Sequence, residues 1–164
     1  MTAKPGETLE QRLLRIEDQL AIYQLISAYG AAADSCNMDA MLALWHEDGE
    51  YAIGGLGNHR GHQGVRNALN GEYHQMLVTN GSGHVNSIPH VVVEGDRAVA
   101  TNFGTLFLWK DGEFILERLA SARWDLVRDR GSWKIMKRTT EPLHGTNQKA
   151  KDLLWRAGDK PAAV

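Results

Sequence analysis

The sequence predicts an α+β fold in which helices pack against a strongly curved antiparallel or mixed sheet. Apolar residues recur at three- and four-residue steps in the first part of the chain, which indicates helices. After residue 84 the pattern changes to alternation, interrupted by short turn signals, which indicates a strand meander. Helices followed by such a meander are typical of α+β domains. A curved sheet wrapped around helices would form a cone-shaped barrel whose open mouth is a default place for a small ligand.

The first half of the chain is expected to hold three helices and one short strand. A long helix covers Glu7 to Ala33, and a short one starts near Asp39 and carries Met41, Leu42, Leu44 and Trp45 as apolar contacts. The other expected elements are a strand over Glu50 to Ile53, a flexible loop over Gly54 to Gly57, and a helix over Gln63 to Met76. The glycine-rich loop could act as a lid, but it lacks the spacing of a phosphate-binding loop.

The second half is expected to hold consecutive strands joined by tight turns. Each strand ends at a turn signal such as Asp111-Gly112, which favours a hairpin. The expected strands cover His84 to Val93, Ala98 to Trp109, Phe114 to Val127 and Trp133 to Thr139. A helix over Asn147 to Arg156 and a mobile end over Gly158 to Val164 complete the expected order.

Length and composition predict one soluble domain over residues 1–164, with a core of about 9–143 and a tail over 144–164. The net charge is −2 and basic residues are interspersed with acidic ones, so no nucleic-acid partner is expected. The single cysteine, Cys36, excludes an intrachain disulfide and a cysteine-cluster zinc site. Because no signal-like or membrane-length apolar run is present, we expect a cytoplasmic protein with no membrane partner.

Asp34 and His84 are the strongest candidates for chemistry. Asp34 ends the apolar face of the long helix, and a carboxylate buried there is costly unless it is paired. His84 stands where a strand begins, and a histidine paired with a carboxylate can act as a general base. The alternatives are a turn residue for Asp34, since Asp34-Ser35-Cys36-Asn37 is also a loop signal, and a partly exposed strand-start residue for His84.

Several residues could line the cavity around this pair. Strand alternation places one of Glu117 and Arg118, and one of Lys137 and Arg138, on the concave side. The apolar neighbours of Arg118 disagree about its direction, because Leu116 shares its parity while Leu119 shares that of Glu117. Aromatic candidates for the lining, most of which are expected to be core, are Tyr51, Trp45, Phe103, Phe107, Trp109 and Trp124.

The chain resembles SnoaL-like proteins of the nuclear transport factor 2-like superfamily over roughly Leu13 to Arg138. The segments that carry the resemblance are Ile22 to Asp34, Leu42 to Tyr51, Val93 to Ala98, Arg123 to Asp125 and Gly131 to Ile135. Within that superfamily the pattern is nearest to hexachlorocyclohexane dehydrochlorinase, and more distantly similar to scytalone dehydratase.

The resemblance implies roles for individual residues. Asp34 and His84 fall at the positions of the dehydrochlorinase Asp-His base, and Arg138 falls at the position of an arginine near the leaving group. Tyr29 lies close to the position where that family places a cation, and Arg118 stands where scytalone dehydratase has a second histidine. Tyr29 is not a cation and Arg118 is not a histidine, so the chain departs from each of these two families at one site position.

We therefore expect a cofactor-independent lyase or isomerase, of dehydratase, dehydrohalogenase or polyketide cyclase-like type, that acts on a small hydrophobic cyclic molecule. Asp34 and His84 would be the base, Arg138 the anion stabiliser, and Tyr29, Tyr51, Trp45, Phe103 and Arg118 substrate-binding residues. No metal site is expected, because no tight histidine spacing occurs. The alternative is a non-catalytic binding protein or an accessory subunit such as the small subunit of a ring-hydroxylating dioxygenase. A homodimer or homotrimer is the expected assembly.

Overall fold

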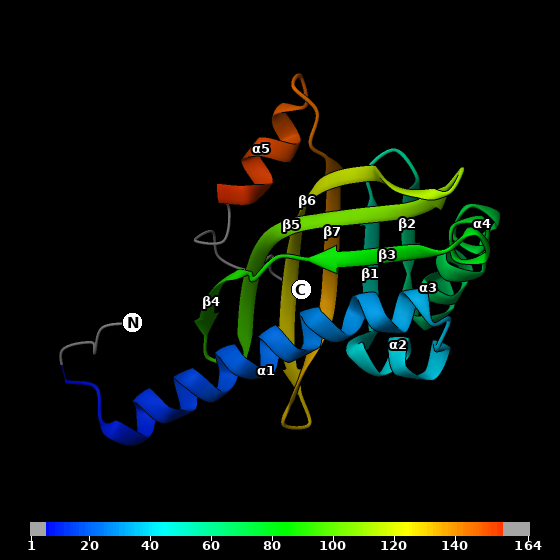
Figure 1. Cartoon of the computed structure of the whole chain (residues 1–164). Coiled ribbons are helices and arrows are strands. Elements are labelled where there is room, and N and C mark those ends of the chain that lie inside the picture. Colours follow the sequence, from blue (N-terminus) through cyan, green and yellow to red (C-terminus); the bar gives the residue numbers. More distant parts are fainter. Residues whose placement is uncertain (1–5, 156–164) are drawn as a thin grey trace.

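A computed structural model of the chain describes residues 6–155. It consists of helices and one curled, unclosed mixed sheet, which confirms the α+β class (Figure 1). The helices are α1 (Leu9–Asp34), α2 (Met38–Leu44), α3 (Gly61–Asn70), α4 (Glu72–Asn80) and α5 (Gln148–Trp155). The strands are β1 (Trp45–Ile53), β2 (Gly57–Arg60), β3 (Ser82–Asn86), β4 (His90–Glu94), β5 (Arg97–Lys110), β6 (Glu113–Asp129) and β7 (Ser132–Pro142).

The sheet runs in the order β2-β1-β7-β6-β5-β3, and β4 also pairs with β5. All neighbours are antiparallel except β1 and β7, which are parallel. The parallel pair arises because the chain passes through α3, α4 and the β3–β6 meander before β7 returns beside β1. Figure 1 shows α1 crossing in front of the sheet, with α3 and α4 gathered at one end of it. That end is where the site forms.

The C-terminal half of α1 supplies the helical part of the core. Ile22, Ile26 and Tyr29 follow a three- and four-residue spacing and are almost completely buried. They pack in one cluster with Trp124 of β6 and Ile135 of β7. The N-terminal half extends past the sheet (Figure 1), and its apolar residues stay exposed, although their spacing is also helical: Leu9, Leu13, Ile16 and Leu20.

Four expectations about elements need correction. Trp45 begins β1 instead of lying on α2, because its extended backbone ends that helix. Gly57 opens β2, which pairs with β1, so the expected loop is a hairpin with a short turn. The expected third helix is two helices that meet at Gly71, whose backbone is extended. The strand expected from His84 to Val93 is divided into β3 and β4 around Pro89, which cannot donate a ladder hydrogen bond.

The expected tail helix is confirmed as α5, and its Ala150 and Leu153 are buried. The remaining part of the expected tail, residues 156–164, lies outside the described residues. Within residues 6–155, no helix combines the length and apolarity that a bilayer crossing would require.

Candidate functional site

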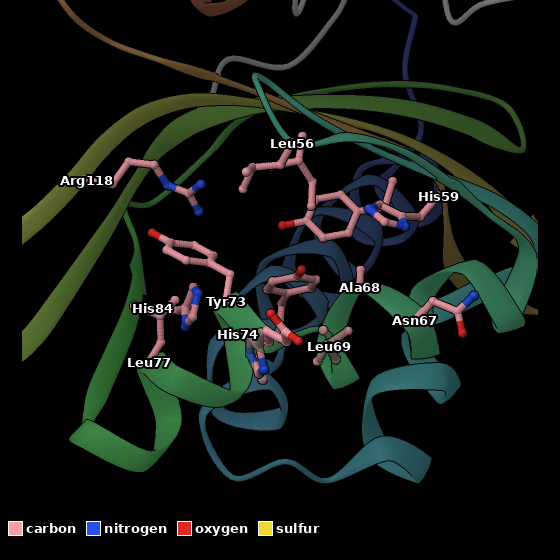
Figure 2. Close-up of a pocket in the computed structure, with 16 residues that line it drawn as sticks. Leu56, His59, Asn67, Ala68, Leu69, Tyr73, His74, Leu77, His84 and Arg118 are labelled. Atoms are coloured by element: carbon pink, nitrogen blue, oxygen red, sulfur yellow. The ribbon is translucent and has the colours of Figure 1, made fainter.

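A cavity of about 230 Å³ lies between α1, α3, α4 and the concave face of the sheet. Apolar, aromatic and a few polar side chains share its wall, and Figure 2 shows Arg118, Tyr73, His84 and His74 along one side of it. The lining residues are Tyr29, Ala33, Tyr51, Ile53, Leu56, His59, Asn67, Ala68, Leu69, Gly71, Glu72, Tyr73, His74, Leu77, His84 and Arg118.

Asp34 and His84 are in direct contact beside this cavity, although they lie fifty positions apart in the chain. The Oδ1 atom of Asp34 is 2.6 Å from Nδ1 of His84, and its Oδ2 atom accepts the backbone N–H of His84 at 2.6 Å. The Ser82 hydroxyl donates a third hydrogen bond to Oδ1 at 3.0 Å. The carboxylate therefore binds both the ring and the backbone of His84, which fixes the ring against the end of α1.

The end of α1 points the Asp34 side chain toward β3. The N–H of Cys36 donates to the Ala33 carbonyl, and the N–H of Asn37 donates to the Ala32 carbonyl. Cys36 has a left-handed backbone with φ of 50°. These two bonds and this conformation form a Schellman motif, which ends the helix immediately after Asp34. The loop signal of Asp34-Ser35-Cys36-Asn37 therefore marks the end of the helix. This helix end still allows the Asp34 carboxylate to be paired.

Gly30 allows β3 to approach α1. It lies one helical turn before Asp34, and a Cβ atom there would collide with the backbone carbonyl of His84. Every residue other than glycine carries a Cβ, so a larger residue would force the strand away from the helix. The contact between Asp34 and His84 depends on this close approach.

The hydrogen bonds keep Asp34 ionised. Burial acts to raise the pKa of the Asp34 carboxyl, but the hydrogen bonds from the His84 side chain and backbone, the charge interaction with His84 and the hydrogen bond from Ser82 together outweigh it, so the pKa lies below its ordinary value. A carboxylate at Nδ1 favours the tautomer with hydrogen on that nitrogen. The Nε2 atom of His84 has no hydrogen-bond partner among residues 6–155, and His84 lines the cavity. The pair is thus arranged so that Nε2 can accept a proton.

Arg138 is buried at the bottom of the site, only 5% exposed, in a group of aromatic rings. The sheet brings them together, because Arg138 of β7 is paired with Tyr51 on one side and Trp124 on the other. Its guanidinium carbon lies 4.3 to 5.1 Å from the ring centroids of Tyr29, Trp124 and Tyr51. Arg138 therefore points inward, whereas Lys137 pairs with Glu50.

The Nη1 atom of Arg138 donates to the hydroxyl oxygens of Tyr51, at 2.6 Å, and Tyr29, at 3.3 Å. Each hydroxyl oxygen accepts from the arginine, and a hydrogen bond between the Tyr29 and Tyr51 side chains uses one of the two hydroxyl hydrogens, so the other remains available as a donor. Burial, and then the neighbouring Tyr51, raise the pKa of Tyr29 well above its ordinary value despite the opposing charge of Arg138. Both tyrosines line the cavity, whereas Arg138 does not.

Arg118 faces the cavity because β6 contains a bulge. Leu106 of β5 pairs with Arg118, but Phe107 pairs with Leu116, so Glu117 is an extra residue in β6. Because of this extra residue, side chains after the bulge point to the opposite face from the one that strict alternation would give them. Leu116 and Leu119 consequently both lie on the outer face, 55% and 38% exposed, which resolves their conflicting parity.

Trp45 and Phe103, expected in the lining, do not reach the cavity. Trp45 is 2% exposed and packs in the core beside Tyr51, with ring centroids 5.7 Å apart. Phe103 is 44% exposed because its neighbour Asn102 points inward, where it accepts a hydrogen bond from the buried Trp124 indole at 2.9 Å. Phe107 and Trp109 are also substantially exposed on the sheet.

His74 of α4 is a cavity residue that the sequence analysis did not single out. Its ring stacks on that of His84, with centroids 5.9 Å apart and planes 29° apart. Both ring nitrogens are buried without a hydrogen bond of ordinary geometry. Burial, followed by the nearby His84, lowers the pKa of His74, although the Leu69 backbone and Asp34 act in the opposite direction. Nothing in the local sequence distinguishes His74 from an exposed helical histidine.

Comparison with known proteins identifies the family. The SnoaL-like domain family matches residues 14–139, most of the chain. The chain belongs to the SnoaL-like family. A nuclear transport factor 2-like protein with a cystatin-like fold from Novosphingobium aromaticivorans is 33% identical, with a TM-score of 0.85, over 91% of this chain and 98% of that one. No curated protein sequence matches the chain.

Two further solved structures share the fold of this SnoaL-like protein. Hexachlorocyclohexane dehydrochlorinase from Novosphingobium barchaimii has a TM-score of 0.70 at 21% identity, over 82% of this chain and 95% of the other. A proposed scytalone dehydratase from N. aromaticivorans has a TM-score of 0.67 at 18% identity, over 79% of this chain and 87% of the other. At these identities the likeness establishes the SnoaL-like fold, and any shared chemistry has to be argued from the site.

Within residues 6–155, no group of three or more His, Cys, Asp or Glu side chains is arranged to hold a metal ion. The arrangement of this SnoaL-like site instead offers a carboxylate-bound imidazole, two tyrosine hydroxyls attached to a buried arginine, and a second arginine at the wall.

Proposed function

We propose that this protein is a cofactor-independent lyase or isomerase in which His84, paired with Asp34, removes a proton from a small apolar cyclic substrate. The observation that carries the proposal is the 2.6 Å contact between Asp34 Oδ1 and His84 Nδ1 beside the cavity. It leaves Nε2 as the proton acceptor, and a positioned general base contributes about a hundredfold to ten-thousandfold in rate.

The developing negative charge would be stabilised by the tyrosine hydroxyls. Tyr29 and Tyr51 line the cavity, and Arg138 donates to both of their oxygens. A cation that donates a hydrogen bond to a hydroxyl oxygen makes the hydroxyl hydrogen a stronger donor to an anion. The proposed role of Arg138 is therefore to polarise these hydroxyls, which differs from direct contact with a leaving group.

The reaction types that suit a histidine base and hydroxyl donors are elimination, dehydration, isomerisation and ring closure. Each begins with removal of a proton from carbon or oxygen, and each needs only a base and donors to the resulting anion. The fold neighbours described as a dehydrochlorinase and a scytalone dehydratase support elimination and dehydration as the first reactions to test. We propose no metal or organic cofactor.

The proposal can be tested by proton exchange, which does not require the complete reaction. A halogenated cyclohexane, a hydroxylated bicyclic ketone and a cyclic diketone would be incubated with the protein in D2O and followed by mass spectrometry and chloride release. We expect deuterium incorporation or elimination with at least one compound, and its loss in His84→Ala. His90→Ala, which removes an exposed histidine on β4, is the matched control. Turnover that persists in correctly folded His84→Ala would refute the assignment.

The second candidate is a protein of the same fold that binds a small molecule without reacting, or an accessory subunit of a larger enzyme. The exposed apolar residues on the outer face of the sheet, among them Phe114 at 66% and Trp109 at 44%, favour contact with another chain. This face also supports our proposal of a homodimer or homotrimer, which analytical ultracentrifugation would test. Binding without proton exchange for the whole panel would favour the second candidate.

A further inference from the structure

Arg118 presents an uncompensated positive charge to the cavity. Among residues 6–155 its guanidinium makes no ion pair within 4.0 Å and no hydrogen bond, although it is partly buried and lines the cavity. Figure 2 shows its guanidinium turned toward the cavity, above the hydroxyl of Tyr73. An arginine carries five N–H donors in a planar fork that matches a carboxylate. All of these donors are free to bind a ligand.

Arg138 adds a second positive charge without a carboxylate partner in the same region. It is 5% exposed, and its Nε atom is buried without a hydrogen bond. A small cavity of about 20 Å³ is bordered by Arg118, Arg138 and His84, and also by Asn86, whose Oδ1 atom is buried without a partner. This volume suffices for about one water molecule. The two arginines therefore border a common space that His84 also lines.

The acidic residues nearby do not neutralise these charges. Glu72 lines the main cavity and Glu117 precedes Arg118, but neither is in an ion pair with Arg118 or Arg138. The Asp34 carboxylate is already bound by His84 and Ser82. A partly buried cation without a counter-charge is unfavourable, so an anion placed beside it gains more than it would in water.

We propose that the ligand of this cavity is a small cyclic molecule that carries a carboxylate, and that Arg118 binds this carboxylate. The ring would lie against Leu56, Ala68 and Leu69, with its reacting atom toward His84 Nε2. This inference rests on the proposed function for the identity of the cavity as the substrate site. It adds a substrate class and names Arg118 as the residue that selects it.

The test measures binding and does not depend on turnover. Benzoate, cyclohexanecarboxylate and 2-naphthoate would each be compared with the corresponding neutral amide by isothermal titration calorimetry at constant ionic strength. We expect at least one acid to bind about tenfold more tightly than its amide, as suits a charge-assisted hydrogen bond. Arg118→Gln should reduce that ratio to about twofold or less while amide binding is retained, and Arg118→Lys should keep part of it.

Arg130→Gln is the matched control, because it removes one positive charge from a side chain that is 92% exposed on the β6–β7 turn. It should leave the acid-to-amide ratio unchanged, and thermal unfolding would verify that each variant is folded. The proposal is wrong if no acid in the panel binds more tightly than its amide, or if the preference survives in Arg118→Gln. If His84-dependent proton exchange occurred with neutral substrates and with no carboxylate, this inference would be overturned. The proposed function would remain intact.

Discussion

Gly30 of α1 lies against the backbone carbonyl of His84 on β3. The helix and the strand could not approach each other this closely if residue 30 carried a side chain. Asp34 follows one turn later on the same helix and binds the same strand residue. A glycine in the middle of a helix lowers helix stability by about 1 kcal/mol relative to alanine. Gly30 carries this cost, and its missing side chain permits the contact that aligns the His84 imidazole.

Gly30→Ala should therefore damage both stability and activity. A Cβ that meets backbone cannot be accommodated by a side-chain rotation, so we expect a loss of about 1–3 kcal/mol in the free energy of unfolding. Gly83→Ala is the control on β3, where an added Cβ would meet nothing within 4 Å. Urea unfolding and proton exchange would be measured for both, and equal behaviour of the two variants would contradict the role of Gly30.

Acid should remove the stabilisation that Asp34 provides. Its folded pKa lies below the ordinary value of 3.8, so the unfolded chain takes up a proton first as the pH falls. The contribution is complete above about pH 5 and is lost as the pH falls through 3.8 toward the folded pKa. The difference in unfolding free energy between the native protein and Asp34→Asn should shrink over this window. A difference that stays constant from pH 6 to pH 3 would contradict this account.

His74 should make the protein less stable as the pH falls below neutrality. Its folded pKa lies below the ordinary 6.5, so the unfolded state binds the proton more readily and stability falls as the pH passes through 6.5. His74→Phe removes this proton uptake, so it should lose less stability than the native protein between pH 7.5 and about pH 5. His90→Phe, on the exposed side of β4, is the control. If the free energy of unfolding fell with pH to the same extent in the native protein and in His74→Phe, this role of His74 would be contradicted.

Tyr51→Phe should weaken the bottom of the site. It removes the oxygen that accepts the 2.6 Å hydrogen bond from Arg138, and this leaves a buried guanidinium less satisfied. Loss of such a partner costs about 1–3 kcal/mol in the free energy of unfolding. Tyr23→Phe is the control, since the Tyr23 hydroxyl makes no hydrogen bond within residues 6–155. Chemical denaturation would separate the two, and an equally small effect in both would show that the bond contributes little.

The sequence predicts the fold class from local periodicity, and it predicts the Asp34–His84 contact from one local signal together with a family resemblance. An apolar helix face that ends in a charge requires a partner, and the resemblance to SnoaL-like proteins supplied its position. The inward direction of Arg118 was left open, since a bulge at Glu117 leaves no mark in the alternation except the conflict between Leu116 and Leu119. His74 was missed because its burial depends on how α4 packs against β3, which local periodicity does not encode.

The state of the His84 ring tests the central claim most directly. Nitrogen-15 NMR of the imidazole nitrogens would be recorded near pH 8 for the native protein and for Asp34→Asn. The account predicts that native His84 carries its hydrogen on Nδ1 and leaves Nε2 unprotonated, and that this tautomer preference weakens when Asp34 is replaced. A native His84 with its hydrogen on Nε2, or a spectrum unchanged by Asp34→Asn, would contradict the proposal that this pair is a base.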